Sequence, residues 1–195
     1  MKMENETPLT EHESLRIIQE MITAAKNDVK ADAFIFLLWG YLVLIASITQ
    51  FILLTLNVDH NGTPWLLMPL GGLITIIYVI RKNKKIRTKT HVSEFLKFIW
   101  IAFGVALGIL MFCTTIPVLQ MMPLIMMLYG VGLFLSGGAL KFKPLIAGGI
   151  FCWICAIAGF EIQSIYQLLI LALAVLGGYV IPGHLLQFNN RNTNV

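Results

Sequence analysis

The chain has 195 residues, of which 57% are hydrophobic and only 12% are charged, and its mean hydropathy is +0.80. A water-soluble domain of this size cannot bury so much apolar surface, because small folds leave a large fraction of their area in solvent. The composition therefore excludes an ordinary soluble domain and indicates a membrane protein embedded in a lipid bilayer. The net charge of +4 does not indicate nucleic-acid binding, because the cations lie in short segments between apolar runs.

The first part of the chain, residues 1–32, is polar and of mixed charge, and we expect no cleavable signal peptide in it. Its apolar residues recur at spacings of three and four, which is typical of one face of a helix. These residues are Leu15, Ile18, Ile22, Ala25 and Val29. We expect a short amphipathic helix that lies along the inner membrane surface or on the protein's own cytoplasmic face. Pairing with a second copy and docking of a cytoplasmic protein are the alternatives.

Six apolar segments follow, each close to the roughly 20 residues that a helix needs to cross a hydrocarbon core about 30 Å thick. In chain order they are 34–56, 65–80, 95–114, 118–136, 144–160 and 165–181. The expected fold is an all-α polytopic membrane protein with a six-transmembrane-helix bundle over 33–183. The segment 1–32 precedes the bundle, and we expect 184–195 to be a cytoplasmic tail.

All fourteen Lys and Arg residues fall on one side of the membrane if the chain crosses it at each of these segments. Short connections rich in Lys and Arg stay in the cytoplasm, so we expect both termini to be cytoplasmic. The most basic connection, 81–91, is expected to contact anionic lipid head groups, with docking of an acidic or regulatory protein as the alternative.

Small residues recur four apart within several spans, as in Gly104 with Gly108, Gly148 with Cys152, and Ala174 with Gly178. Lipid provides little hydrophobic drive between helices, so close approach through small residues holds a membrane bundle together. We expect these pairs to pack helices of one chain, and a homodimer interface is the alternative. Tyr179 is expected near the inner membrane boundary, where Tyr rings are favoured. Other polar residues within spans are expected to hydrogen-bond between helices: Thr49, Gln50, Thr75, Tyr129, Ser136 and Gln167.

Two groups of residues are candidate sites. Cys152 and Cys155 lie three apart in mid-helix, which puts their Cβ atoms about 5–6 Å apart, whereas a disulfide needs about 3.8 Å. We expect inert packing, with a redox pair and a metal site as the alternatives. On the outer side, the loops with Asp59, His60 and Glu161 hold the strongly polar residues, and a ligand or metal site there is the alternative to a simple turn. We expect no metal, cofactor or catalytic residue.

Four segments resemble a group of uncharacterised bacterial six-span inner-membrane proteins. They are FLLWGYLVLIA (36–46), LLMPLGGLITIIY (66–78), LSGGALKFKPLIAGGIFCW (135–153) and LGGYVIPGHLL (176–186). The resemblance implies a helical bundle in a bacterial inner membrane, and it implies no activity or catalytic residue.

No Asp, Glu, Arg or His lies deep within a predicted span, although ion-coupled transporters and proton relays usually need such residues. We therefore expect a non-enzymatic regulator, sensor or scaffold. A transporter or channel for a neutral or apolar solute and a membrane thiol oxidoreductase are the alternatives.

Overall fold

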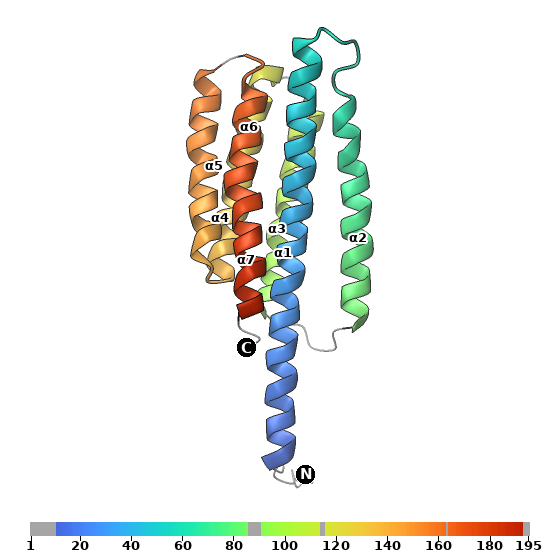
Figure 1. Ribbon diagram of the computed structural model, residues 1–195, viewed down its shortest axis with the longest axis vertical. Helices are drawn as coiled ribbons and strands as arrows, with labels where there is room; N and C mark the ends of the chain where they lie inside the picture. Colours follow the sequence, from blue (N-terminus) through green and yellow to red (C-terminus); the bar gives the residue numbers. More distant parts are fainter. Residues whose placement is uncertain (1–10, 86–90, 114–115, 163, 193–195) are drawn as a thin grey trace, which may run out of the picture.

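The computed structural model describes residues 11–85, 91–113, 116–162 and 164–192, and every regular element within these ranges is a helix. Six helices are long and apolar enough to span a membrane, so the expected all-α six-span bundle is confirmed. The helices stand side by side, and both termini lie at the same end of the bundle (Figure 1).

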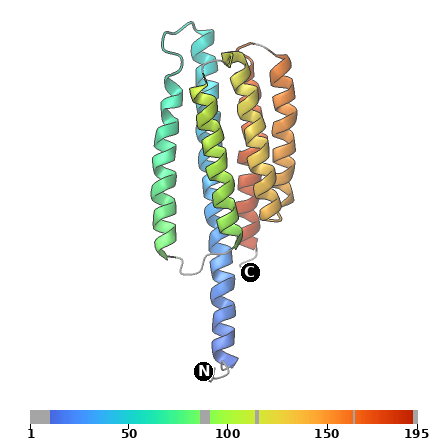
Figure 2. The ribbon, with the colours of Figure 1, turned by 180° about the vertical axis from the view of Figure 1, so that it is seen from behind.

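The first helix, α1 (Glu11–Thr55), is unbroken over 45 residues. Its second half is the first span, and its first half continues in the same direction beyond the ends of the other helices (Figures 1 and 2). The amino-terminal segment is helical as expected, but a helix in line with a span cannot lie along the membrane surface. The helix α1 is continuous because residues 11–39 contain neither Gly nor Pro, so nothing in the sequence breaks or kinks it between its two halves.

The other helices complete the bundle in a simple order. Around the bundle, the packing order is α2, α1, α6 with α7, α5, α4 and α3, so α2 and α3 are its two ends. The bounds are as follows: a 3₁₀ turn η1 (Thr63–Leu66), α2 (Leu67–Lys85), α3 (His91–Phe112), α4 (Val118–Ala139), α5 (Lys143–Glu161), α6 (Gln167–Val175), a π-helical turn η2 (Leu176–Val180) and α7 (Ile181–Asn192).

Hydrogen bonds between side chains attach α2 and η1 to α1. The indole Nε1 of Trp39 donates to Thr75 Oγ1 at 3.1 Å, and that of Trp65 donates to Gln50 Oε1 at 2.6 Å. On the other side of the bundle, Gln167 Nε2 donates to the carbonyl oxygen of Gly159 on α5 at 2.8 Å. The interhelical role expected for Thr75, Gln50 and Gln167 is thus confirmed.

Glycines bring α4 and α5 into close backbone contact. A Cβ atom added at Gly149 would lie 2.8 Å from both the carbonyl oxygen of Gly130 and the amide nitrogen of Phe134. A Cβ at Gly137 would lie 2.7 Å from the amide nitrogen of Ile146. The two helices therefore pack where only glycine leaves room, as expected for close approach within one chain.

The Gly104–Gly108 pair on α3 behaves differently. A Cβ atom added at either glycine would meet nothing within 4 Å in the described chain. The expectation that this pair packs two helices of one chain is therefore wrong. Spacing shows that the two glycines share one face of a helix, but it does not show which way that face points.

The sixth span runs further than expected, because α7 continues as a helix to Asn192 and includes much of the predicted tail 184–195. Pro182 lacks the N–H that would bond to the carbonyl of Gly178 four residues earlier, and its ring crowds that carbonyl. The wider π-helical turn η2 precedes it, and the chain then continues as α7. The predicted span ended at residue 181, just before this proline, but the proline instead follows a change of helical register within a longer span.

Candidate functional site

The two cysteines of α5 are both buried, with Cys152 0% and Cys155 5% exposed, and both thiols are free. Cys152 Sγ donates to the carbonyl oxygen of Ala174 on α6 at 3.4 Å. A Cβ added at Gly178 would lie 2.6 Å from the same sulfur. The small residues of α5 and of the sixth span thus face one another, and this geometry supports a packing role for Cys152.

The polar residues predicted to lie on the outer side of the membrane are not brought together. Asp59 and His60 lie in the connection after α1, whereas Glu161 ends α5, and all three are exposed. Figures 1 and 2 show these two places well apart across the bundle. Within the described ranges there is no group of three or more His, Cys, Asp or Glu residues that could hold a metal ion. The basic connection 81–91 lies partly outside the described residues, which end at Lys85 and resume at His91.

Five aromatic rings form a closed circuit between α1, α3, α4 and η2. Successive ring centroids are 5.2–6.1 Å apart, within the range of favourable aromatic contacts. In order around the circuit the rings are Phe36, Trp100, Phe103, Tyr129 and Tyr179. These rings connect α3 to α1 and η2, and they fill the interior between these helices.

Tyr179 lies at the centre of this arrangement and not near the membrane boundary as expected. It is ten residues before the end of the span Gln167–Asn189, or about 15 Å along a helix, which is near mid-membrane. Its side chain is 3% exposed, and its hydroxyl has no hydrogen-bond partner among the described residues. Ser136 Oγ is also buried without a partner in the part of the chain that the structure describes, so the interhelical hydrogen bond expected for Ser136 is not found there.

We expect Tyr179→Phe to leave the free energy of unfolding unchanged or to raise it by about 1 kcal/mol, because it removes a buried hydroxyl that makes no hydrogen bond. Denaturation in mixed micelles followed by circular dichroism measures the change. Thr75→Val is the control, because that hydroxyl accepts the bond from Trp39 and its loss is expected to destabilise the bundle. If Tyr179→Phe destabilised the bundle as much as Thr75→Val, the Tyr179 hydroxyl would have to make a stabilising hydrogen bond, which would contradict the structure.

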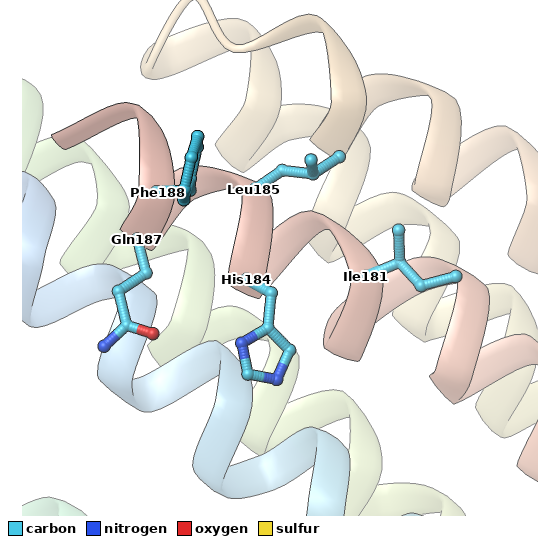
Figure 3. Close-up of a pocket in the computed structure, with 5 residues that line it drawn as sticks. All are labelled: Ile181, His184, Leu185, Gln187 and Phe188. Carbon is cyan, nitrogen blue, oxygen red and sulfur yellow. The ribbon is translucent and has the colours of Figure 1, made fainter. Parts of the chain in front are cut away.

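A second polar feature lies on the lateral surface of the bundle, between α1 and α7. The hydroxyl of Tyr41 on α1 and Nε2 of His184 on α7 are 2.8 Å apart, and the two rings meet edge to face. His184 also lines a pocket of about 450 Å³ together with Ile181, Leu185, Gln187 and Phe188 (Figure 3). A polar pair and a pocket therefore coincide on α7.

These features had weak signals in the sequence. The GGYVIP run of residues 177–182 contains the two glycines and the proline that accompany the π-helical turn. The pair of adjacent glycines was the sequence feature that pointed to an irregular helix there. The aromatic circuit joins residues up to 143 positions apart, and no periodic pattern links them. The Tyr41–His184 contact likewise depends on how α1 and α7 pack.

The fold defines a multi-pass helical membrane protein. Comparison of the chain with protein-family models, with curated proteins and with solved structures finds no match in any of the three. The comparisons thus give no support to the family resemblance drawn from the sequence.

Proposed function

We propose that this protein is a non-enzymatic regulator, sensor or scaffold of the bacterial plasma membrane with both termini in the cytoplasm. The projecting first half of α1 carries this proposal (Figure 1). It lies at the end of the bundle where both termini and the Lys-bearing α4–α5 turn are found. Because α1 is one helix, a protein that binds residues 11–32 acts mechanically on the first span.

The packed interior supports this proposal over the alternatives. Leu133, Leu145 and Leu171 are fully buried, and the aromatic circuit occupies the centre of the bundle. A transporter would need a polar path through this region. A thiol oxidoreductase would need substrate access to Cys152, whose side chain is enclosed by the small residues of the sixth span.

The test compares capture of cytoplasmic proteins by the full chain and by variants of the projecting segment in mild detergent. Ile18→Asp with Ile22→Asp places two charges on the apolar stripe, and Gln19→Asp with Thr23→Asp places the same charges off it. We expect the first pair to reduce capture at least to the level of a chain lacking residues 1–32, and the second pair to leave capture unchanged. Equal capture by all of these chains, with unchanged bundle stability, would refute the proposal.

The orientation is tested separately in a chain whose three cysteines are replaced by alanine. A membrane-impermeant maleimide added to intact cells is expected to label His60→Cys and not Asn190→Cys, because short Lys- and Arg-rich connections stay in the cytoplasm. After the cells are opened, both positions are expected to react. Labelling of Asn190→Cys in intact cells would overturn the assignment of both termini to the cytoplasm.

A further inference from the structure

One face of α3 is not used by its own bundle. Leu96, Trp100 and Phe103 lie on the inward side of this helix: Leu96 is buried, and the two rings belong to the aromatic circuit. Gly104 and Gly108 lie away from that side, and a Cβ added at either glycine would meet nothing within 4 Å in the described chain. Figure 2, in which α3 is the light-green helix, shows no other helix on the near side of it.

The same face of α3 has a shape that can pack against a copy of itself. Each glycine is followed directly by a β-branched residue, Val105 after Gly104 and Ile109 after Gly108. Val105 and Ile109 are 59% and 65% exposed, and Ile101, one turn before Val105, is 50% exposed. The glycines leave a shallow groove, and the β-branched side chains form a ridge beside it that loses little rotamer freedom on packing. The groove and ridge of one helix therefore fit the ridge and groove of an identical helix.

A second copy of this chain presents its α3 in the orientation that such packing needs. Two copies that insert into one membrane in the same direction have parallel α3 helices, and a twofold axis brings their identical faces together. Close contact through small residues is the interaction that associates helices in lipid. Gly72 on α2 is also open, but Met68 and Ile76 lie four residues from it, so α2 has no comparable groove.

The charged residues at the start of the third span fit the same arrangement. Glu94 and Lys97 each lie seven residues before a residue of this face, Ile101 and Gly104 respectively, and thus on the same side of the helix. Both are exposed, and neither has an ion-pair partner in the part of the chain that the structure describes. In a parallel twofold pair, Glu94 of each copy is offset by about 4.5 Å along the helix from Lys97 of the other. The long Lys side chain spans this offset, so two reciprocal ion pairs can form.

We propose that the protein forms a parallel homodimer through α3, in which the two helices cross at Gly104 and Gly108. Ile101, Val105 and Ile109 pack beside the crossing point. These residues lie on the outward face of α3, so dimerisation leaves the interior of each bundle unchanged. The proposal does not depend on the function proposed above, because the interface is the same whether or not residues 11–32 bind another protein.

The dimer is measured on the full chain in liposomes. Labelled protein is diluted stepwise into phosphatidylcholine vesicles, and single-molecule photobleaching counts the copies that remain together. Gly104→Ile with Gly108→Ile fills the groove, and Gly72→Ile is the matched control, because a Cβ at Gly72 also meets nothing within 4 Å in the described chain. We expect the double variant to raise the dissociation constant of the dimer about tenfold or more, and the control to leave it unchanged.

Charge reversal tests the parallel arrangement of the two copies. Lys97→Glu alone and Glu94→Lys alone place like charges opposite one another, and each is expected to weaken the dimer about two- to fivefold, the range for exposed ion pairs. The double reversal places opposite charges together again and is expected to restore the dimer. Failure of the double reversal to restore it would overturn the parallel arrangement.

Disulfide cross-linking keeps the proposal falsifiable if the glycine variant fails to fold. In a chain whose three cysteines are replaced by alanine, Val105→Cys is expected to cross-link two copies in the membrane, and Leu73→Cys is not. Leu73 on α2 is 56% exposed, close to the value for Val105, so random collisions would link both positions equally. The proposal is overturned by a monomer at every dilution, by equal dissociation constants for the glycine variant and Gly72→Ile, or by equal cross-linking at the two positions.

Discussion

Replacing Gly149 by alanine is expected to lower the free energy of unfolding by about 2–3 kcal/mol, which is the usual cost of overpacking a close contact. The added Cβ would lie 2.8 Å from both the Gly130 carbonyl oxygen and the Phe134 amide nitrogen. Both neighbours are backbone atoms of a helix, so neither can rotate away. The helices α4 and α5 must separate, and this loosens the largest interface of the bundle.

Gly138→Ala is the matched control for this prediction. Gly138 lies on α4, the helix that Gly149 of α5 packs against, in the next-to-last position of that helix, and a Cβ there would meet nothing within 4 Å in the described chain. We expect a change of no more than about 0.5 kcal/mol. Denaturant titration in mixed micelles, followed by circular dichroism, measures both variants. Equal stabilities of Gly149→Ala and Gly138→Ala would show that α4 and α5 do not pack through their glycines.

The contrast between these two glycines shows what the sequence could predict. Apolar length and the distribution of Lys and Arg predicted six spans, because both are averages over many residues and small errors cancel. The spacing of Gly148 with Cys152 and of Ala174 with Gly178 predicted close helix contacts, and the structure places these two pairs against one another. The same spacing at Gly104 and Gly108 gave a wrong expectation, because the direction of a helix face is set by the whole bundle.

The candidate sites were harder to predict for the same reason. Tyr179 was assigned to the membrane boundary because tyrosine is favoured there, but the π-helical turn and the rings of Phe36, Trp100 and Tyr129 surround it near mid-membrane. His184, which lines the pocket on α7, contacts Tyr41, and these two residues belong to the sixth and first spans. Only the packing of α1 against α7 brings this pair together.

The second large effect concerns the contact between η2 and α5. We expect Gly178→Ala to destabilise the bundle by about 1–3 kcal/mol, because the new Cβ would lie 2.6 Å from Cys152 Sγ and 2.9 Å from Leu133 Cδ1. Cys152→Ala alone is expected to cost about 1 kcal/mol, since it removes one buried atom and its contacts. In the double variant the sulfur is gone and the methyl group of Leu133 can rotate away, so the combined loss should be smaller than the sum.

A double-mutant cycle measures this coupling, which we expect to be about 1 kcal/mol in favour of the double variant. Cys155→Ala with Gly178→Ala is the control cycle, because Cys155 is not among the atoms nearest to the Gly178 Cβ position, and its losses are expected to add. If Cys152 served as a redox partner of Cys155 and not as a packing residue, both cysteines would behave alike in the two cycles. Additive losses in the Cys152 cycle would therefore remove the support for packing between Cys152 and the π-helical turn.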